Sequence, residues 1–396
     1  MKKVLFVCYG GGHVGILLPI AERLQEMQIK IEFLALTTAI NVLKTTEYKY
    51  YTFKDFFKSK EVLYYGKKLL EGLESHKMDD SDSISYLGQN FIELIDNHGI
   101  SDADYIYKRD GRSSFFPLES ISLILSELQP DLVISTNSPR SEKAAIFASR
   151  KLGIPSIAIG DLFMIRPLKW FSDNSFADKI CVFNIESKKK LVDLGRNEAS
   201  VIVTGNPAFD VLVKLSEKTN VRNRQAKFKI LWASQAEPEY FAESLVKGDE
   251  NLPMKVEEKL LEIVKNNNNF ELFVRNHPNE VVRDYPNNVI VSNDTNLVDL
   301  LRNIDLVITL TSIVGFEAVL LGKELITIDL SVLSNMLPYS KYGYSTGVDN
   351  LEVLEKEIKI IYNKKESKES KPYSIQNATG MICNEVKSIL NIYDFE

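Results

Sequence analysis

Two short segments of this chain place small residues and a polar side chain just after an apolar run. The run 4–7 leads into Gly10-Gly11-Gly12-His13, and the run 306–308 leads into Thr311-Ser312, with Gly315 and Glu317 following. Each pattern is typical of a strand that ends where a helix begins. The N-terminus of a helix offers unpaired backbone N–H groups and a positive dipole end, so it attracts phosphate. We therefore expect a phosphate-bearing ligand in a cleft between two α/β domains.

Two residues of the first half are candidates for moving a proton. His13 has a side chain whose ordinary pKa suits a general base acting on a hydroxyl, although it could equally serve to orient the glycine loop. Asp161 follows a predicted strand, and ligands bind at the carboxyl edge of parallel sheets; a helix N-cap is its other interpretation. Asp110, followed by Gly111, is a third carboxylate, for which an ordinary turn is favoured.

The second half carries polar residues that could hold a nucleotide. Arg275-Asn276-His277-Pro278 follows an apolar run, and we expect His277 to contact a phosphate or the base while Pro278 fixes the chain direction. A polar turn is the alternative. Thr311 and Ser312 offer hydroxyls at a helix start and can also cap it. Glu317, one turn further, could accept both ribose hydroxyls.

Metal chemistry is not expected. Asp-x-Asp triplets, which can hold Mg²⁺, occur at 80–82 and 102–104, but both lie in polar segments that we predict to be solvated loops. Cys8, Cys181 and Cys383 lack metal-binding spacing and fit a reducing cytosol. We therefore predict no metal and no cofactor.

The elements that would position these residues alternate between strand and helix patterns, which predicts parallel sheets and the α/β class. The length of 396 residues suits two domains. We predict an N-terminal domain at 1–213 with an insertion near 53–111, a polar linker at 214–227, and a C-terminal domain at 228–375. A last helix at 376–396 is expected to pack back on the N-terminal domain.

Composition limits the partners and the location. The net charge of −6 argues against a nucleic-acid surface. No run of about 18 apolar residues is present, and the N-terminus reads as a strand rather than a signal peptide, so a cytoplasmic protein is predicted. The aromatic and basic segment 163–171 fits either a membrane interface or a packed interdomain loop, which leaves peripheral membrane contact open. The sequence does not give the oligomeric state.

The order of the motifs resembles the GT-B class of nucleotide-sugar enzymes, which holds glycosyltransferases and UDP-N-acetylglucosamine 2-epimerases. Gly11-Gly12-His13-Val14 resembles the acceptor-side loop of lipid-II-forming and UDP-glucuronosyl-type transferases, and 203–207 is similar to an epimerase segment. Segments 275–278 and 311–312 resemble capsule Kdo transferases and sialyltransferases, which use CMP-sugars. The resemblance implies two Rossmann-like domains facing across a cleft. It also implies a nucleotide-sugar site made of Gly11, Gly12, Gly205, Asn206, Arg275, His277, Pro278, Thr311, Ser312, Gly315 and Glu317.

The chain departs from the hydrolysing epimerases at three places. Gly-Gly-Gly-His stands where those enzymes carry an Arg-containing loop, 233–237 replaces a His-Arg-rich turn, and 329–331 replaces a Thr-Glu-Arg-Pro-Glu segment. The resemblance therefore favours a metal-independent glycosyltransferase of bacterial cell-surface glycan biosynthesis. Its donor would be a CMP-nonulosonate or a UDP-hexosamine, and its acceptor a glycan, a lipid-linked molecule or a protein. A 2-epimerase or nucleotide-sugar hydrolase, and a non-catalytic nucleotide-sugar-binding protein, are the alternatives.

Overall fold

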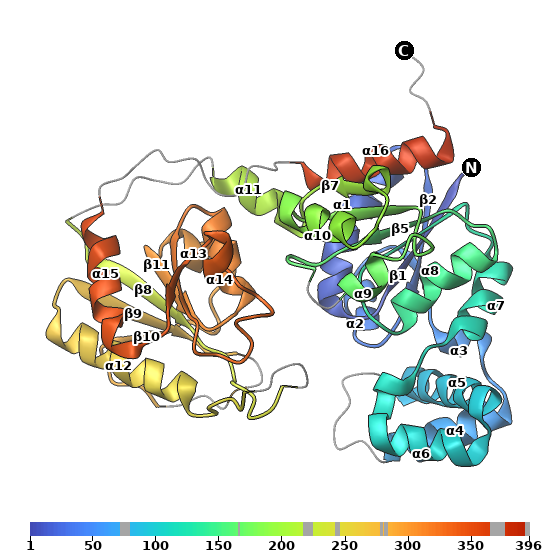
Figure 1. The fold of residues 1–396 in the computed structure, drawn as a ribbon, viewed down its shortest axis with the longest axis horizontal. Helices are drawn as coiled ribbons and strands as arrows, with labels where there is room; N and C mark the ends of the chain where they lie inside the picture. The colour runs from blue at the N-terminus through green and yellow to red at the C-terminus, as the bar shows by residue number, and fades with distance from the viewer. Residues whose placement is uncertain are drawn as a thin grey trace. The chain divides into compact units, whose positions relative to one another are not determined.

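The computed structural model describes residues 1–71, 80–164, 167–216, 225–241, 246–277, 280, 284–364 and 377–392. The chain divides into two compact units, shown in Figure 1. Unit 1 consists of residues 1–208 and 377–396, and unit 2 consists of residues 209–376.

The described part of unit 1 is built on a seven-stranded parallel sheet in the order β3-β2-β1-β4-β5-β6-β7. The central strands are apolar and buried along nearly their whole length, as expected for a sheet covered on both faces. The strands are β1 (Lys3–Cys8), β2 (Lys30–Ala35), β3 (Lys49–Tyr51), β4 (Leu132–Ser135), β5 (Ser156–Ile159), β6 (Lys179–Val182) and β7 (Val201–Val203).

Helices cover this sheet, and one of them comes from the far end of the chain (Figure 1). Helix α16 (Ala378–Leu390) buries Ile382 and Val386 in the same apolar core as Leu17 of α1, so the C-terminal helix belongs to unit 1. The other helices around the sheet are α1 (Gly11–Glu26), α2 (Ala39–Leu43), α7 (Leu118–Leu128), α8 (Ser141–Lys151), α9 (Leu168–Phe171) and α10 (Ile185–Asp193).

The segment predicted as an insertion is helical. It holds α3 (Phe53–Phe56), α4 (Lys60–Glu71), α5 (Asp80–His98), α6 (Ile100–Asp110) and the 3-10 turn η1 (Gly111–Ser114). Helices α4 and α5 cross closely, since a Cβ built on Gly66 would stand 2.0 Å from the backbone oxygen of Ile84. The solvated loops expected at the two Asp-x-Asp triplets are wrong: both triplets lie in helices, and Asp82 is buried with its carboxylate 2.9 Å from the ammonium of Lys54.

The described part of unit 2 has a six-stranded parallel sheet in the order β10-β9-β8-β11-β12-β13. The strands are β8 (Phe228–Ala233), β9 (Phe270–Arg275), β10 (Val289–Val291), β11 (Leu306–Thr309), β12 (Glu324–Ile328) and β13 (Thr346–Val348). The helices are α11 (Asp210–Ser216), α12 (Leu252–Asn266), α13 (Leu297–Arg302), α14 (Ile313–Leu320) and α15 (Leu354–Asn363). The division between units falls after residue 208 rather than 213, because Phe209 packs on Phe316 of α14.

Both sheets reverse their strand order at one point. In unit 1 the chain moves outward from β1 to β3, then restarts at β4 on the other side of β1; in unit 2 the same happens between β8 and β11. Connections that diverge in opposite directions leave a crevice at the carboxyl ends of the two central strands, where open α/β sheets bind ligands. The predicted α/β class is confirmed, and each unit has one such crevice position.

Several apolar side chains of the segment 163–171 are buried in unit 1. Phe163, Met164 and Phe171 are each at most 1% exposed, with Met164 and Phe171 in an apolar cluster of unit 1; residues 165 and 166 lie outside the described residues. These side chains pack inside unit 1, and peripheral membrane contact of the segment stays a prediction. None of the helices in the described ranges is long and apolar enough to cross a membrane.

Candidate functional site

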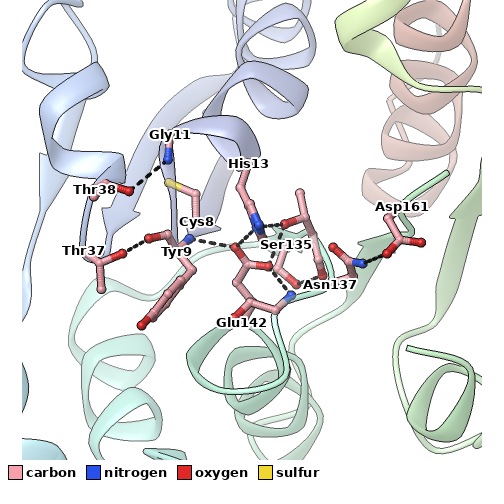
Figure 2. A network of polar contacts seen from close by, with 12 residues as sticks. Cys8, Tyr9, Gly11, His13, Thr37, Thr38, Ser135, Asn137, Glu142 and Asp161 are labelled. Atoms are coloured by element: carbon pink, nitrogen blue, oxygen red, sulfur yellow. Dashed lines mark hydrogen bonds and ion pairs between the residues drawn. The ribbon is translucent and has the colours of Figure 1, made fainter. Parts of the chain in front are cut away.

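The crevice of unit 1 contains a buried carboxylate, Glu142, in the first turn of α8. Its Oε1 accepts hydrogen bonds from the backbone N–H of Tyr9 and from Nδ1 of His13, both at 2.7 Å. Its Oε2 accepts from the hydroxyl of Thr136 at 2.6 Å and from the backbone N–H of Ser138 at 2.8 Å (Figure 2). Tyr9 follows β1, His13 lies in α1, and Thr136 and Ser138 follow β4, so Glu142 ties the two central strands together.

Four donors occupy the acceptor sites of the Glu142 carboxylate and hold it ionised. Burial raises the pKa of Glu142, but the neighbouring His13 and the hydrogen bonds from Thr136 and Ser138 outweigh burial, and the pKa is lowered. Because a carboxylate can only accept, the proton between the two side chains belongs to Nδ1 of His13. The hydroxyl oxygen of Thr136 lies 2.5 Å from the same nitrogen and is a second acceptor for that proton.

These contacts engage Nδ1 of His13 and leave its other ring nitrogen, Nε2, available to accept a proton. Nε2 has no hydrogen bond to any residue in the described ranges, and the side chain is 31% exposed. Burial lowers the pKa of His13, but the charge and hydrogen bond of Glu142 and the charge of Asp161 outweigh it, so the pKa is raised. A raised pKa makes Nε2 a stronger proton acceptor near neutral pH.

Asp161 lies at the same edge of the sheet, just after β5 (Figure 2). Its Oδ2 accepts from the side-chain amide of Asn137 and its Oδ1 from the backbone N–H of Met164, both at 2.8 Å. Burial raises the pKa of Asp161. No helix of the described chain begins at Asp161, so it caps a turn rather than a helix. The structure thus brings both predicted proton-transfer candidates, His13 and Asp161, to the carboxyl edge of β1, β4 and β5.

The glycines near His13 form the start of α1 rather than a separate loop. Gly10 is the N-cap, Gly11 donates its N–H to the hydroxyl of Thr38 at 3.4 Å, and no atom lies within 4 Å of a Cβ built on Gly12. The N-terminus of α1 is therefore open beside Gly12.

Asp110, the third carboxylate considered as a base, is held by its neighbour Arg109. Arg109 binds both oxygens of Asp110 and lowers its pKa, which does not suit a base.

Gly205 and Asn206 are not brought to His13. They follow β7, which β5 and β6 separate from β4 in the sheet. Gly205 has φ +82°, a conformation that favours glycine, and the Asn206 side chain accepts from the N–H of Ala208 at 3.0 Å. Both residues shape the turn that ends the main part of unit 1.

Two residues form a reciprocal hydrogen-bonded pair at the switch point of unit 2. The side-chain amide of Gln235, which follows β8, donates to the hydroxyl of Thr311 at 2.8 Å and accepts from its N–H at 3.0 Å. Thr311 is buried, and in this structure its N–H is bonded to Gln235 rather than open to a ligand. Ser312 caps α14, its hydroxyl accepting from the N–H of Val314 at 3.3 Å.

Glu317 is one of several unit 2 residues with a buried polar atom that lacks a hydrogen-bond partner in the described ranges. Its Oε2 is buried and has no hydrogen-bond partner in the described ranges. Burial raises the pKa of Glu317 to about 6, and the charge of Arg275 opposes this only partly. Arg275 ends β9 and donates to the backbone oxygens of Ser292 at 2.8 Å and Thr295 at 2.9 Å. A half-buried carboxylate that lacks a donor is suited to accept hydroxyl groups.

The residues predicted for the nucleotide site also include Gly315, His277 and Pro278. Gly315 is required by packing, since a Cβ there would stand 2.8 Å from Leu325 Cδ1 on β12. The side chain of His277 is exposed, and its backbone N–H donates to Glu280 at 2.8 Å. Pro278 lies outside the described residues. The described ranges contain no group of three metal-ligating side chains.

Sequence reasoning missed Glu142, Thr136 and Gln235. Glu142 precedes the apolar Ala144-Ala145 on the buried face of a helix, and this position was the available signal. Thr136 and Gln235 each follow a buried strand closely, as ligand-binding residues of α/β sheets do. In the sequence Gln235 stands out only as part of the departure from the epimerases at 233–237.

The comparisons with known proteins agree with this architecture. A family model described as "Capsule polysaccharide biosynthesis protein" matches residues 257–334, a part of unit 2 that includes Arg275, Thr311 and Glu317. No curated protein sequence matches.

Several solved structures resemble the chain over its whole length. S. aureus MnaA in a co-structure with UDP has a TM-score of 0.62 at 14% identity, covering 100% of this chain and 99% of that one. UDP-GlcNAc 2-epimerase from Neisseria meningitidis, bound to UDP-GlcNAc, has a TM-score of 0.59 at 16% identity, covering 98% and 100%. Acinetobacter baumannii MurG has a TM-score of 0.55 at 16% identity, covering 98% and 100%. At these identities the likeness shows the fold, and the chain has the two-unit α/β fold of the GT-B class, as the motif order predicted.

Proposed function

We propose that this chain is a glycosyltransferase that moves a sugar from a nucleotide-sugar donor to an acceptor hydroxyl in the biosynthesis of a bacterial surface glycan. The observation that carries the proposal is the His13–Glu142 pair. Nδ1 of His13 is fixed on a buried carboxylate, while Nε2 is left open at the switch point of the sheet. A base in this setting suits the deprotonation of a hydroxyl.

The proposed reaction is a direct displacement at the anomeric carbon. Nε2 of His13 takes the proton of the acceptor hydroxyl, and Glu142 stabilises the imidazolium that forms. The acceptor oxygen bonds to the anomeric carbon as the bond from that carbon to the donor phosphate oxygen breaks. The electron pair leaves with the phosphate, and the configuration of the sugar is inverted. Asp161, whose charge raises the pKa of His13, assists by favouring the protonated ring.

We assign the donor nucleotide to unit 2. Oε2 of Glu317 accepts no hydrogen bond from the part of the chain that the structure describes, which suits the ribose hydroxyls, and the N-terminus of α14 can stabilise a leaving phosphate. The family-model match covers this part of the chain. We retain both a UDP-hexosamine and a CMP-nonulosonate as donors. Two of the similar structures hold UDP or UDP-GlcNAc, which favours the first. Segments 275–278 and 311–312 favour the second. The proposal requires no metal.

A second candidate is a UDP-N-acetylglucosamine 2-epimerase or nucleotide-sugar hydrolase. The full-length likeness to a UDP-GlcNAc 2-epimerase favours it. The two candidates predict different products, because an epimerase or hydrolase needs no acceptor, whereas a transferase leaves the sugar on one.

The test begins with calorimetric titration of UDP, CMP, GDP, ADP and dTDP, each with Mg²⁺ and with a chelator. Sugar donors of the nucleotide that binds are then incubated with and without acceptor glycans. His13→Gln should abolish transfer yet retain nucleotide affinity, since His13 lies in unit 1; His98→Gln, an exposed histidine on α5, is the matched control. Full transfer by His13→Gln would refute the assignment. Acceptor-independent release of sugar or an epimer would support the second candidate, and binding without any turnover would indicate a binding protein.

A further inference from the structure

Arg140 is linked to the His13–Glu142 pair through Tyr9. Arg140 precedes α8, and its guanidinium carbon lies 4.5 Å above the centre of the Tyr9 ring. The backbone N–H of Tyr9 bonds the same Glu142 oxygen that holds His13 (Figure 2). The guanidinium is therefore placed by the same residues that place the base.

The hydrogen-bonding capacity of Arg140 is almost unused. A guanidinium carries five N–H donors. In the described ranges Arg140 makes one long hydrogen bond, from Nη1 to the backbone oxygen of Arg112 at 3.4 Å, and its Nε is buried without a partner. Arg196, a buried arginine of the same unit, shows the usual situation: its Nε, Nη1 and Nη2 all donate, to Ser200, Asp173 and Ala177.

No carboxylate in the described ranges neutralises Arg140. The acceptor sites of Glu142 are filled by other donors, and Arg140 forms no ion pair. The first turn of α8 also contains Lys143, which packs over the rings of Phe116, Phe147 and Trp170 and lacks an ion pair in the described ranges. Burial and the charge of Lys169 lower the pKa of Lys143. The start of α8 is thus positively charged and carries spare donors.

We propose that Arg140 binds an anionic group of the acceptor, a carboxylate or a phosphate, next to the hydroxyl that His13 deprotonates. Arginine pairs with such groups through two parallel hydrogen bonds, and the stacking on Tyr9 holds the fork in place before the ligand arrives. The identity of the ligand as an acceptor rests on the proposed function, whereas the binding of an anion beside His13 does not. The acceptor would therefore be an acidic sugar or a sugar phosphate.

The test uses His13 as a reporter. The chain has four histidines, and His13→Gln identifies the His13 ring signal in the NMR spectrum of the full-length protein. Three small probes are titrated: methyl glucuronide, glycerol phosphate and the neutral methyl glucoside. At least one anionic probe should shift the His13 signal in the wild-type protein more strongly than methyl glucoside does. Arg140→Gln should weaken that binding by about tenfold or more.

Two variants control for charge and folding. Arg150→Gln removes the same charge from the exposed end of α8 and should bind the probes as the wild-type protein does. Arg140→Lys keeps the charge but loses the fork, and should bind with intermediate affinity. Thermal unfolding of each variant shows whether the fold is retained.

Each result supports or overturns the proposed anion site at Arg140. A response to methyl glucuronide alone indicates a uronic-acid acceptor, and a response to glycerol phosphate alone indicates a phosphorylated one. Equal affinity for neutral and anionic probes, unchanged affinity in Arg140→Gln, or no shift with either anion overturns it. Anion-dependent shifts in a protein that transfers no sugar would retain the anion site while refuting the proposed function.

Discussion

Replacing Glu142 with glutamine keeps the shape of the side chain but removes its charge and one acceptor. Each oxygen of Glu142 accepts one backbone N–H, from Tyr9 on one side and from Ser138 on the other. Whichever way the amide is turned, its NH₂ faces one of these fixed donors. One buried N–H is then left without a partner, which costs about 1–3 kcal/mol of the free energy of unfolding.

The same change acts on His13. Without the carboxylate, its pKa should fall below the wild-type value, and the ring should lose its preferred protonation on Nδ1. The rate of sugar transfer should drop by roughly 10²–10⁴-fold, the usual contribution of general-base catalysis.

The pH dependence of stability has a definite sign. The folded-state pKa of His13 is raised, so its stabilisation is fully present below the unfolded-state pKa and is lost as pH rises through the folded value. The folded-state pKa of Glu142 is lowered, so its contribution is present above the unfolded value and is lost as pH falls through the folded one. The gap in unfolding free energy between wild type and Glu142→Gln should therefore be larger at about pH 6 than at about pH 9.

The assays are urea denaturation at both pH values and an NMR titration of His13. Glu119→Gln is the matched control, because Glu119 is an exposed glutamate paired with Lys151 on the surface; its stability should change by less than about 0.5 kcal/mol. If His13 titrates at the same pKa in Glu142→Gln as in the wild-type protein, with the fold retained, the reasoning about the pair is refuted.

Three other changes test separate parts of the site. Glu317→Gln should weaken nucleotide binding by about tenfold in calorimetry, since it removes a charged acceptor for hydroxyls; unchanged affinity would remove Glu317 from the donor site. Gly315→Ala should destabilise unit 2 by about 1–3 kcal/mol in denaturant unfolding, because the new methyl group meets Leu325 and Thr309; a neutral effect would show that α14 can shift. Asp161→Asn should be at least as stable as the wild-type protein at neutral pH, because burial raises the pKa of Asp161 and disfavours its charge, while the transfer rate falls; lost stability with full activity would contradict this.

Much of the architecture could be read locally. Apolar runs that alternate with amphipathic helices predict parallel strands, and the small residues after the first strand of unit 1 and the fourth of unit 2 mark helix starts. His13 and Asp161 were found because each follows a strand, and the carboxyl ends of parallel strands share one edge. The predicted loops at the acidic triplets are wrong, because a polar composition alone does not distinguish a loop from a helix start, and the contact that buries Asp82 comes from Lys54, far along the chain.

The sequence by itself determined the α/β class, the two-domain division and the strand-to-helix junctions, because these depend on the periodicity of neighbouring residues. Only the tertiary structure decided what His13 can do, since its partner Glu142 lies 129 positions along the chain and the register of β1 beside β4 brings them together. The tertiary structure also decided that the side chain of Gln235 hydrogen-bonds Thr311. It left Glu317 and Arg140 each with a buried side-chain atom that has no hydrogen-bond partner in the described ranges. Such facts depend on which distant groups are packed together and on whether burial leaves them a partner, and no local pattern records either.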